Sequence, residues 1–409
     1  MRKLLTVIFL LVATNASAFS PFEGGFGFGG TTGVPSYFSG MLLSSLTPVT
    51  GASPTFTRNS TQWYFPAGSS TLTSVSANVP AFETAGYLSE PARTNKATAR
   101  KHNPVDTTNV LKAGDAASVL SVVDDTAALT AAGLMGVCTN GKVYKLDNSA
   151  GTGVAYAEIV GPVGNLNAHS AFAYMRIDAG GTSTLGFTSA GPQAATTSTT
   201  YTKLTLTNYT PTGTAQRIYT KANAASVVYF ILPQLEEGPT VSSVIAGDTL
   251  ATVTRQATVA SYPTTNIPAV GPWAVKLAFT PKMAGSATSA VRYLFSVYTD
   301  ANNETSILYD GTTLTFRKRI GGVNYDATKA LTTVAGTTYN IVARWTANGT
   351  DIFAQGAKGA GNSNTAAPVI GATFQLGSSN GTSQAQANFS NLTIYGNIGD
   401  SRAVALATP

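Results

Sequence analysis

Charge and cysteine are both scarce in this chain. Only 11% of its 409 residues are charged, against about 25% in typical soluble domains. The polar surface must therefore come mostly from Thr, Ser, Asn and Gly, which suit strands and turns better than long surface helices. The single cysteine, Cys138, excludes an intrachain disulfide and a cysteine-rich metal site. We interpret it as a small apolar core residue.

Dense basic clusters and histidines are also missing. The formal net charge is +6, but Lys and Arg are spread out, apart from short groups at 100–101 and 317–319. Nucleic-acid binding usually needs a basic stripe or patch, so we predict no nucleic-acid partner. His102 and His169 are the only histidines, and neither has the spacing of a metal site or of a Ser-His-Asp site. We therefore predict no catalytic residues, no metal, no cofactor and no enzymatic activity.

The apolar run at residues 4–13 is too short to span a bilayer as a helix, which needs about 20 residues. It follows a basic start, Arg2 and Lys3, and precedes small residues that end in Ala-Ser-Ala at position 18. This is the three-part pattern of a secretory signal peptide. We predict a leader at 1–18 and a mature start at Phe19. The alternative is an uncleaved apolar peptide that docks on a partner.

Residues 19–55 form a Gly/Phe-rich arm or linker, because no helix or strand period is visible in its first half. Glycine weakens backbone order, and the phenylalanines are scattered anchors. Two interpretations stay open. The arm is either an extended segment that docks into a neighbouring subunit or a flexible linker.

Alternation of apolar and polar residues, typical of half-buried strands, recurs in two long stretches. In residues 96–245 it is clear at 200–207, and 226–232 is a continuous apolar run that suits a buried strand. In residues 270–398 it is clear at 273–279.

The turn signals support the same interpretation. Asp310-Gly311 between two β-rich runs is a strong hairpin signal. We predict an all-β fold with two β-sandwich, jelly-roll-like domains after the Gly-rich N-terminal arm. A β-rich segment at 56–95 precedes the first domain, a linker at 246–269 joins the two, and a tail follows at 399–409.

Short motifs frame the first domain. The chain reads FTR at 56–58 followed by Tyr64, then NVPAF at 78–82 and GYLSEPARTN at 86–95. After the domain come QLEEG at 234–238, Ser242, Ile245 and TRQA at 254–257. In this order and spacing the chain resembles structural proteins of tailed bacteriophages that carry a carbohydrate-binding-module-like jelly roll. Ala81 departs from that pattern, in which Arg is common.

The second domain resembles the concanavalin-A-like, laminin-G-like sandwich. The strand motifs that carry this resemblance are DGTTLTF at 310–316, YNIVARW at 339–345 and FSNLTIY at 389–395. Such domains often bind glycans or proteins through loops at the rim.

The resemblance to phage proteins implies a function. It implies a non-enzymatic virion protein on the particle surface, as a tail fibre, spike or capsid decoration, that displays its domains for host-surface or glycan attachment. It also implies a homo-oligomer, often a trimer, and contacts with other virion proteins through the arm. The alternative, favoured by the leader, is a secreted or cell-surface bacterial glycan-binding protein, of bacterial or prophage origin. A glycan-cleaving enzyme is disfavoured by the scarcity of acidic residues and histidines.

Arg93 is the most specific candidate for a structural site. Its planar fork can bind a carboxylate at two points, and the first and last strands of a jelly roll lie near each other. We therefore predict a clasp in which Arg93 pairs with Glu236 or Glu237. The alternative is a surface arginine in a turn.

Two further patterns have alternative interpretations. Trp63, Tyr298 and Tyr325 are candidate sugar platforms, although each could equally be a core or edge residue. The acidic stretch at 300–304 could offer oxygens to calcium, but a plain polar turn explains it better.

Overall fold

The structure is a computed structural model that describes residues 36–162, 165–178, 181–187, 193–211, 215–265, 267–269, 271–285 and 290–409. The predicted leader at 1–18 and the first half of the predicted arm lie outside these residues. Residues 34–409 belong to one unit. Within the described ranges, no helix has the length and apolar character needed to cross a lipid bilayer.

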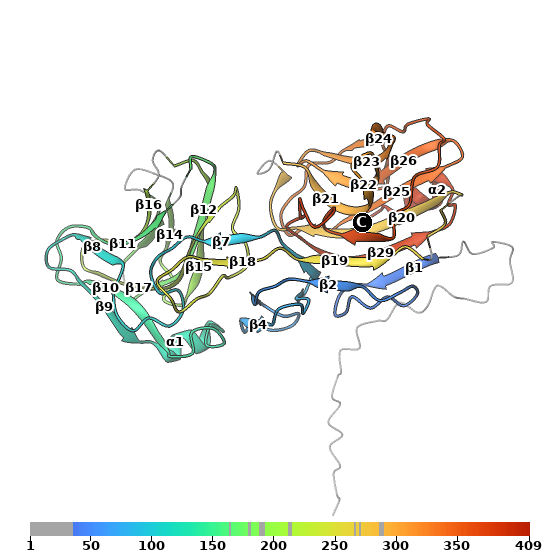
Figure 1. Ribbon diagram of the computed structural model, residues 1–409. Coiled ribbons are helices and arrows are strands. Elements are labelled where there is room, and N and C mark those ends of the chain that lie inside the picture. Colours follow the sequence, from blue (N-terminus) through green and yellow to red (C-terminus); the bar gives the residue numbers. More distant parts are fainter. Residues whose placement is uncertain are drawn as a thin grey trace, which may run out of the picture. The chain divides into compact units, whose positions relative to one another are not determined.

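Two five-stranded antiparallel sheets form what we call the first sandwich (Figure 1). One sheet contains, in order, β15 (Thr202–Tyr209), β12 (His169–Ile177), β17 (Ser226–Glu237), β10 (Lys142–Asn148) and β9 (Val119–Asp124). The other contains, in order, β14 (Gln193–Thr196), β13 (Ser183–Gly186), β16 (Ala215–Ala222), β11 (Ala155–Pro162) and β8 (Val110–Gly114).

Residue alternation determines which face of each sheet is buried. Along β15 only Leu204 and Leu206 are buried, and both join the core between the sheets. On the neighbouring strand β12, Ala171, Ala173 and Met175 enter the same core. Because successive side chains point to opposite faces, one apolar face of each sheet meets the other, and a single core results.

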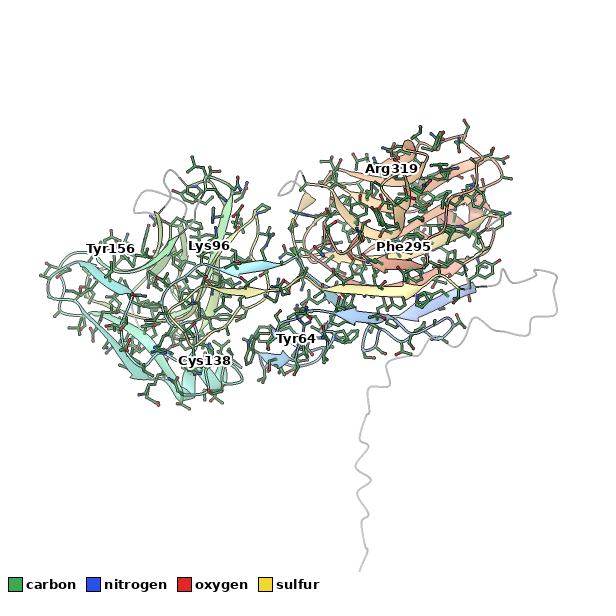
Figure 2. All side chains as sticks on the ribbon, viewed as in Figure 1. Tyr64, Lys96, Cys138, Tyr156, Phe295 and Arg319 are labelled. Atoms are coloured by element: carbon green, nitrogen blue, oxygen red, sulfur yellow. The ribbon has the colours of Figure 1, made fainter. Side chains whose placement is uncertain are left out.

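The opposite face of the β12–β17 sheet carries a second apolar layer. Phe172, Tyr174 and Ile231 belong to it, and α1 (Thr126–Ala131) contributes Leu129. Cys138 is buried in this layer, which confirms its interpretation as a core residue (Figure 2). This face of the first sandwich is therefore covered by a helix and loops.

Two larger sheets form what we call the second sandwich. One contains, in order, β27 (Ala357–Lys358), β26 (Gly349–Ala354), β25 (Tyr339–Thr346), β20 (Trp273–Pro281), β29 (Ala387–Tyr395), β6 (Gly86–Ser89) and β5 (Phe82–Glu83), with β1 (Ser36–Met41) also paired to β29. The other contains, in order, β2 (Thr55–Thr57), β19 (Val259–Pro263), β28 (Thr373–Leu376), β21 (Arg292–Asp300), β22 (Asn303–Tyr309), β23 (Thr313–Ile320) and β24 (Val323–Ala330).

The core of the second sandwich is rich in aromatic residues. Trp273 and Phe295 are fully buried in it, and Figure 2 labels Phe295 there. On the outer face of the larger sheet, α2 (Asp400–Leu406) packs Ala403 against Val342 and Phe353.

The hairpin predicted at Asp310-Gly311 is confirmed. β22 and β23 pair antiparallel, with Tyr309 opposite Leu314. The Asp310 carboxylate accepts hydrogen bonds from the backbone N–H groups of Thr312 and Thr313, at 2.9 and 2.8 Å. Gly311 has a φ of +103°, which a residue with a Cβ rarely adopts.

Strands of the second sandwich come from both sides of the first sandwich in the sequence. β1, β2, β5 and β6 precede residue 96, whereas β19 and the later strands follow residue 258. The chain passes between the sandwiches through β7 (Arg93–Asn95) and returns through β18 (Val253–Arg255). These two strands pair antiparallel, with Asn95 opposite Val253 (Figure 1). The first sandwich is therefore an insertion within the second. β3 (Gln62–Tyr64) and β4 (Thr73–Val75) form a small hairpin, and Gln62 of this hairpin donates a hydrogen bond to Glu90 just before β7.

The predicted fold class is confirmed, because the described chain is all-β and contains two β-sandwiches.

Candidate binding cleft

The sequence motifs that frame the first domain meet at the junction of the two sandwiches. β7 holds Arg93, Thr94 and Asn95, and the paired strand β18 holds Thr254 and Arg255. The Thr94 and Thr254 hydroxyl oxygens lie 2.7 Å apart on an exposed face. Motifs that are about 160 residues apart in sequence therefore lie side by side.

Asn95 joins β7 to the end of the first sandwich. Its Nδ2 donates to the carbonyl oxygens of Pro233 (3.0 Å) and Ile245 (3.2 Å). Its Oδ1 accepts from the N–H groups of Ala97 (3.0 Å) and Leu235 (3.2 Å). All four hydrogen bonds that an asparagine side chain can make are therefore satisfied in a buried position.

Gln234 and Glu236 point to the same side of β17 and bind the segment that follows it. Gln234 Oε1 accepts from the N–H of Ile245 at 2.7 Å, and Glu236 Oε1 accepts from the N–H of Ser242 at 3.0 Å. Gln234 Nε2 also donates to Glu236 Oε1. The spacing of QLEEG, Ser242 and Ile245 thus corresponds to backbone groups that alternate side chains of one strand can reach.

Arg93 and Glu236 lie together, but the contact is long. Arg93 Nε is 3.7 Å from Glu236 Oε2, which is beyond hydrogen-bonding distance. Among the described residues, Arg93 Nε, Arg93 Nη2 and Glu236 Oε2 are buried without a hydrogen-bond partner. Burial raises the pKa of Glu236 despite its hydrogen bonds and the nearby arginines. Burial likewise lowers the pKa of Arg93 despite the Glu236 charge.

Glu237, the other predicted partner of Arg93, binds a different set of groups. Its carboxylate accepts from Asn167 Nδ2 at 2.6 Å and from Asn165 Nδ2 at 3.0 Å. It also lies 3.4 Å from Lys96 Nζ. These asparagine hydrogen bonds, together with the Lys96 charge, lower the pKa of Glu237.

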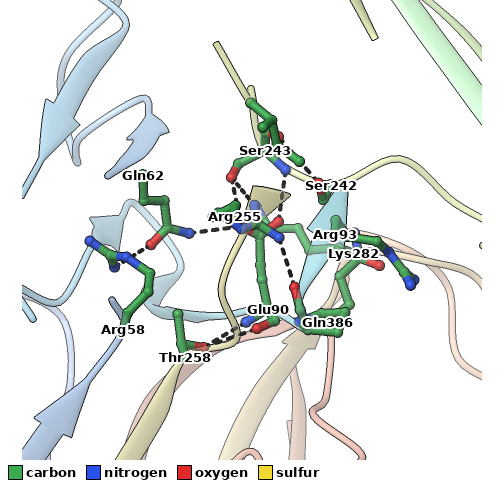
Figure 3. Close-up of polar contacts among 12 residues, drawn as sticks. Arg58, Gln62, Glu90, Arg93, Ser242, Ser243, Arg255, Thr258, Lys282 and Gln386 are labelled. Carbon is green, nitrogen blue, oxygen red and sulfur yellow. Dashed lines mark hydrogen bonds and ion pairs between the residues drawn. The ribbon is translucent and has the colours of Figure 1, made fainter. Parts of the chain in front are cut away.

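The most deeply buried ion pair at the junction, among the described residues, is one that sequence reasoning missed. Arg255 Nη1 lies 2.5 Å from Glu90 Oε2, and both side chains are almost fully buried. Glu90 also accepts from Gln62 Nε2 (2.7 Å), Ser243 N (2.8 Å) and Ser243 Oγ (2.6 Å). Arg58 extends this set by donating to Gln62 Oε1 at 2.6 Å. We call these five residues the junction network (Figure 3).

The junction network controls the protonation of Glu90. Burial alone would raise the pKa of Glu90, but the Arg255 charge and the two Ser243 hydrogen bonds outweigh it and lower the pKa. Arg255 lies in the TRQA motif and Glu90 in the GYLSEPARTN motif, so both residues of the ion pair stood in motifs that the sequence had indicated. Their pairing depended on the antiparallel register of β7 and β18.

A cleft of about 780 Å³ opens beside Arg93. We call it the junction cleft. Arg93 and Thr94 line it from β7, Thr254 from β18, and Arg292 from β21 of the second sandwich. The remaining lining residues are Ala92, Lys96, Asn167, Ala168, Asn208, Glu237, Gly238, Pro239 and Ala290. Both sandwiches thus contribute polar side chains to one concave surface.

The proposed sugar platforms lie elsewhere. Trp63 packs partly buried against the covered face of the first sandwich. Tyr298 and Tyr325 are half-buried on β21 and β24, and the Lys318 ammonium lies 5.7 Å from the centre of the Tyr325 ring. None of the three lines the junction cleft.

The acidic stretch at 300–304 forms a polar turn. The Asp300 carboxylate accepts from the backbone N–H of Asn302 at 2.7 Å and from Asn303 Nδ2 at 3.0 Å. No group of three or more His, Cys, Asp or Glu side chains suited to a metal ion occurs among the described residues. The histidines also lie apart, with His102 beside Asp248 at 3.0 Å and His169 beside Lys96 at 3.2 Å.

No family model and no curated protein matches the chain. Solved structures with similar folds include domain 4 of the GH43 arabinanase AbnA from Geobacillus stearothermophilus, at 17% identity and a TM-score of 0.31, over 42% of this chain and 83% of that one. Domains LG4-5 of the mouse laminin α1 chain are similar at 9% identity and a TM-score of 0.24, over 59% and 88% of the chains. These likenesses concern the β-sandwich fold alone.

A sialidase of Trypanosoma rangeli is also similar, at 11% identity and a TM-score of 0.28, over 71% of this chain. The matched region spans about half (52%) of the sialidase. The prediction that this protein is not an enzyme is corrected here, because carbohydrate-active enzymes are among the structures that resemble it. At these scores the likeness assigns neither a reaction nor a substrate. The virion role is not addressed by these structures and stays a prediction.

Proposed function

We propose that the protein is an attachment protein of a bacteriophage particle that binds a host-surface glycan in the junction cleft. The observation that carries the glycan part is the cleft itself. It is concave, about 780 Å³ in volume, and lined by side-chain donors and acceptors from both sandwiches. Pockets of this size that combine a few convergent polar groups with apolar walls are typical ligand sites.

The chemistry of the lining suits a saccharide. Arg93, Lys96 and Arg292 donate only, whereas Glu237 accepts only. Thr94 and Thr254 present hydroxyl groups that can do either. A sugar carries several hydroxyl groups that both donate and accept, so a mixed rim of this kind can satisfy many of them at once.

The phage part rests on the motifs. The residues that carry the resemblance to phage structural proteins converge at the junction, where Glu90 binds Arg255 and Asn95 binds the backbone beside Gln234. In this proposal the protein lies on the virion surface, as a tail fibre, spike or capsid decoration, and forms a homo-oligomer. The part of the Gly/Phe-rich arm before β1 attaches it to other virion proteins, because β1 itself pairs with β29 in the second sandwich.

A secreted or cell-surface bacterial glycan-binding protein is the second candidate. The signal-peptide pattern at residues 1–18 favours it. The two candidates share the glycan site and differ in location.

Two measurements test the proposal. The purified full-length protein is applied to an array of bacterial surface saccharides, and we expect binding that is lost when a bulky residue fills the cleft, as in Thr254→Trp. The absence of binding to any saccharide would contradict a glycan site. N-terminal sequencing of the protein recovered from its natural source separates the locations. A chain that begins at Met1 within purified particles supports the virion protein, whereas a chain that begins at Phe19 in the culture medium supports the secreted one.

A further inference from the structure

The junction cleft contains two guanidinium groups that lack a close carboxylate partner. Arg292 is half-buried at the start of β21, and its guanidinium makes no ion pair or hydrogen bond with any described residue. Burial lowers the pKa of Arg292, and the charge of Arg93 lowers it further. Both arginines line the same cleft, so two positive charges share one concave surface.

Arg93 packs against Gly238 and makes only a long contact with the Glu236 carboxylate. A Cβ placed on Gly238 would approach Arg93 Nη2 to 2.7 Å, so the guanidinium lies directly over that glycine. The 3.7 Å approach to Glu236 satisfies none of the N–H groups of Arg93 by the usual distance for hydrogen bonds. A cation that is partly buried and poorly paired is costly to maintain unless an anion binds it.

The other charged groups of the cleft pair with one another. Lys96 and Glu237 lie 3.4 Å apart, and Glu237 is also bound by Asn165 and Asn167. The charged side chains of the lining are three cations, Arg93, Lys96 and Arg292, and one carboxylate, Glu237. Positive charge is therefore in excess. Glu236 lies 3.7 Å from Arg93 and does not line the cleft. Burial raises the pKa of Glu236 and so favours its neutral form.

The lining residues include no aromatic side chain in the part of the chain that the structure describes. A neutral hexose usually stacks on such a ring, and here it would have only hydrogen bonds. An oxyanion gains more from this surface, because the planar fork of the half-buried Arg292 can bind two oxygens of a carboxylate or phosphate at once. Arg93 can add its Nη1, since its Nε and Nη2 are buried.

We infer that the junction cleft takes an acidic saccharide, whose carboxylate or phosphate group binds between Arg93 and Arg292. This inference rests on the proposed glycan-binding function and makes it more specific. The Thr94 and Thr254 hydroxyls, which lie on the same lining, would bind neighbouring hydroxyl groups of the sugar. Arg292 comes from the second sandwich and Arg93 from the strand that leads to the first, so the anion would bridge both.

The test compares each acidic saccharide with a neutral counterpart that has the same sugar backbone. Full-length protein is titrated with trigalacturonate and with its methyl ester, which keeps the sugar backbone and removes the carboxylate charge. A third arm uses mannose 6-phosphate against mannose. We expect the charged form of at least one pair to bind at least tenfold more tightly than its neutral partner, because a hydrogen-bonded charge pair contributes about that factor. The preference should decrease at high salt.

Variants of Arg292 assign the preference to the cleft. Arg292→Gln should abolish the preference for the charged form, and Arg292→Lys, which keeps the charge but loses the fork, should retain part of it. Arg402→Gln is the matched control, because it removes the same charge from an exposed position on α2 and should leave binding unchanged. Thermal unfolding of each variant shows that it is folded.

The outcomes separate the inference from the function on which it rests. Equal binding of the charged and neutral forms, or an undiminished preference in folded Arg292→Gln, would overturn the acidic-saccharide inference and leave glycan binding in place. Failure to bind any saccharide, on this test and on the array, would overturn both. A preference for the phosphate pair alone identifies phosphate as the source of the oxyanion.

Discussion

At the scale of single residues, the junction depends on charges that are removed from water. Glu90 and Arg255 are separated by 165 positions in sequence, and both side chains are almost fully buried. Burying two charges is favourable only when their remaining donors and acceptors are also satisfied. Glu90 meets this condition, since Gln62 and Ser243 donate to its carboxylate in addition to Arg255.

Glu90→Gln should therefore destabilise the protein by about 3 kcal/mol at pH 7, because Arg255 would be left as a buried charge without a counter-ion. Urea unfolding of both proteins measures the difference. Glu83→Gln is the matched control, since Glu83 pairs with Lys282 in a more exposed position and should contribute less than about 1 kcal/mol. Equal effects of the two substitutions would contradict the importance of the junction network.

The same pair predicts a dependence on pH. The pKa of Glu90 is lowered in the folded protein, so its contribution is fully present above the unfolded-state pKa of about 4.3 and is lost as the pH falls through the folded-state value. The difference in stability between the wild type and Glu90→Gln should therefore narrow below pH 4. A difference that stays constant from pH 7 to pH 3 would show that Glu90 is not responsible.

Gly238 provides a second test at this scale. Its φ is +137°, and a Cβ there would approach Arg93 Nη2 to 2.7 Å. Gly238→Ala should lower the free energy of unfolding by about 1–3 kcal/mol through backbone strain and should also displace Arg93. In Gly399→Ala, the control, the added methyl group would enter open space. Because Gly399 is the N-cap of α2, where alanine is less favourable than glycine, we expect a loss of at most about 1 kcal/mol by thermal unfolding.

At the scale of elements, the paired strands β7 and β18 join the two sandwiches, and Asn95 fixes β7 to the end of β17. Both halves of its amide are used. Nδ2 faces the carbonyl oxygens of Pro233 and Ile245, and Oδ1 faces two backbone N–H groups. The side chain thus forms hydrogen bonds to backbone groups of three separate segments.

Asn95→Asp should be strongly destabilising, because a carboxylate of the same shape would face two carbonyl oxygens with no hydrogen to donate. We expect a loss of about 3 kcal/mol or more from buried, unsatisfied groups, measured as a lower urea midpoint. Asn348→Asp, in an exposed turn, is the matched control and should change the midpoint little. A small effect at Asn95 would show that the junction tolerates rearrangement.

At the scale of the whole molecule, the core of the second sandwich is independent of the inserted one. All of its buried apolar residues lie before residue 96 or after residue 258, whereas the core between the sheets of the first sandwich lies within 97–235. Apolar contacts between the insertion and the rest of the chain occur mainly in the covered layer. There Leu72, which lies outside the insertion, packs with Leu129 and Cys138.

Excision of the first sandwich tests this arrangement. Asn95 and Val253 are paired neighbours, so a short Gly-Ser loop can join them directly. We expect the remaining chain to stay β-rich by circular dichroism and to unfold cooperatively, with Trp63 more exposed to solvent because its packing partners are gone. A shift of the Trp63 fluorescence to longer wavelength would report that exposure, with Trp63→Phe identifying its contribution. An unfolded product would show that the insertion is required for the second core.

The sequence by itself determined the fold class, many of the strands and their buried faces. Alternation along 200–207 predicted the inward positions of Leu204 and Leu206, and Asp310-Gly311 predicted a hairpin, because both signals depend on residues that are close in the chain. The motifs also led to the prediction that Arg93 pairs with Glu236 or Glu237, and this clasp stays a prediction. Only the tertiary structure decided that the first sandwich is inserted in the second, that Glu90 binds Arg255, and that Arg292 shares a cleft with Arg93. These facts depend on which distant strands pair and in which register, and local patterns of polarity do not specify that choice.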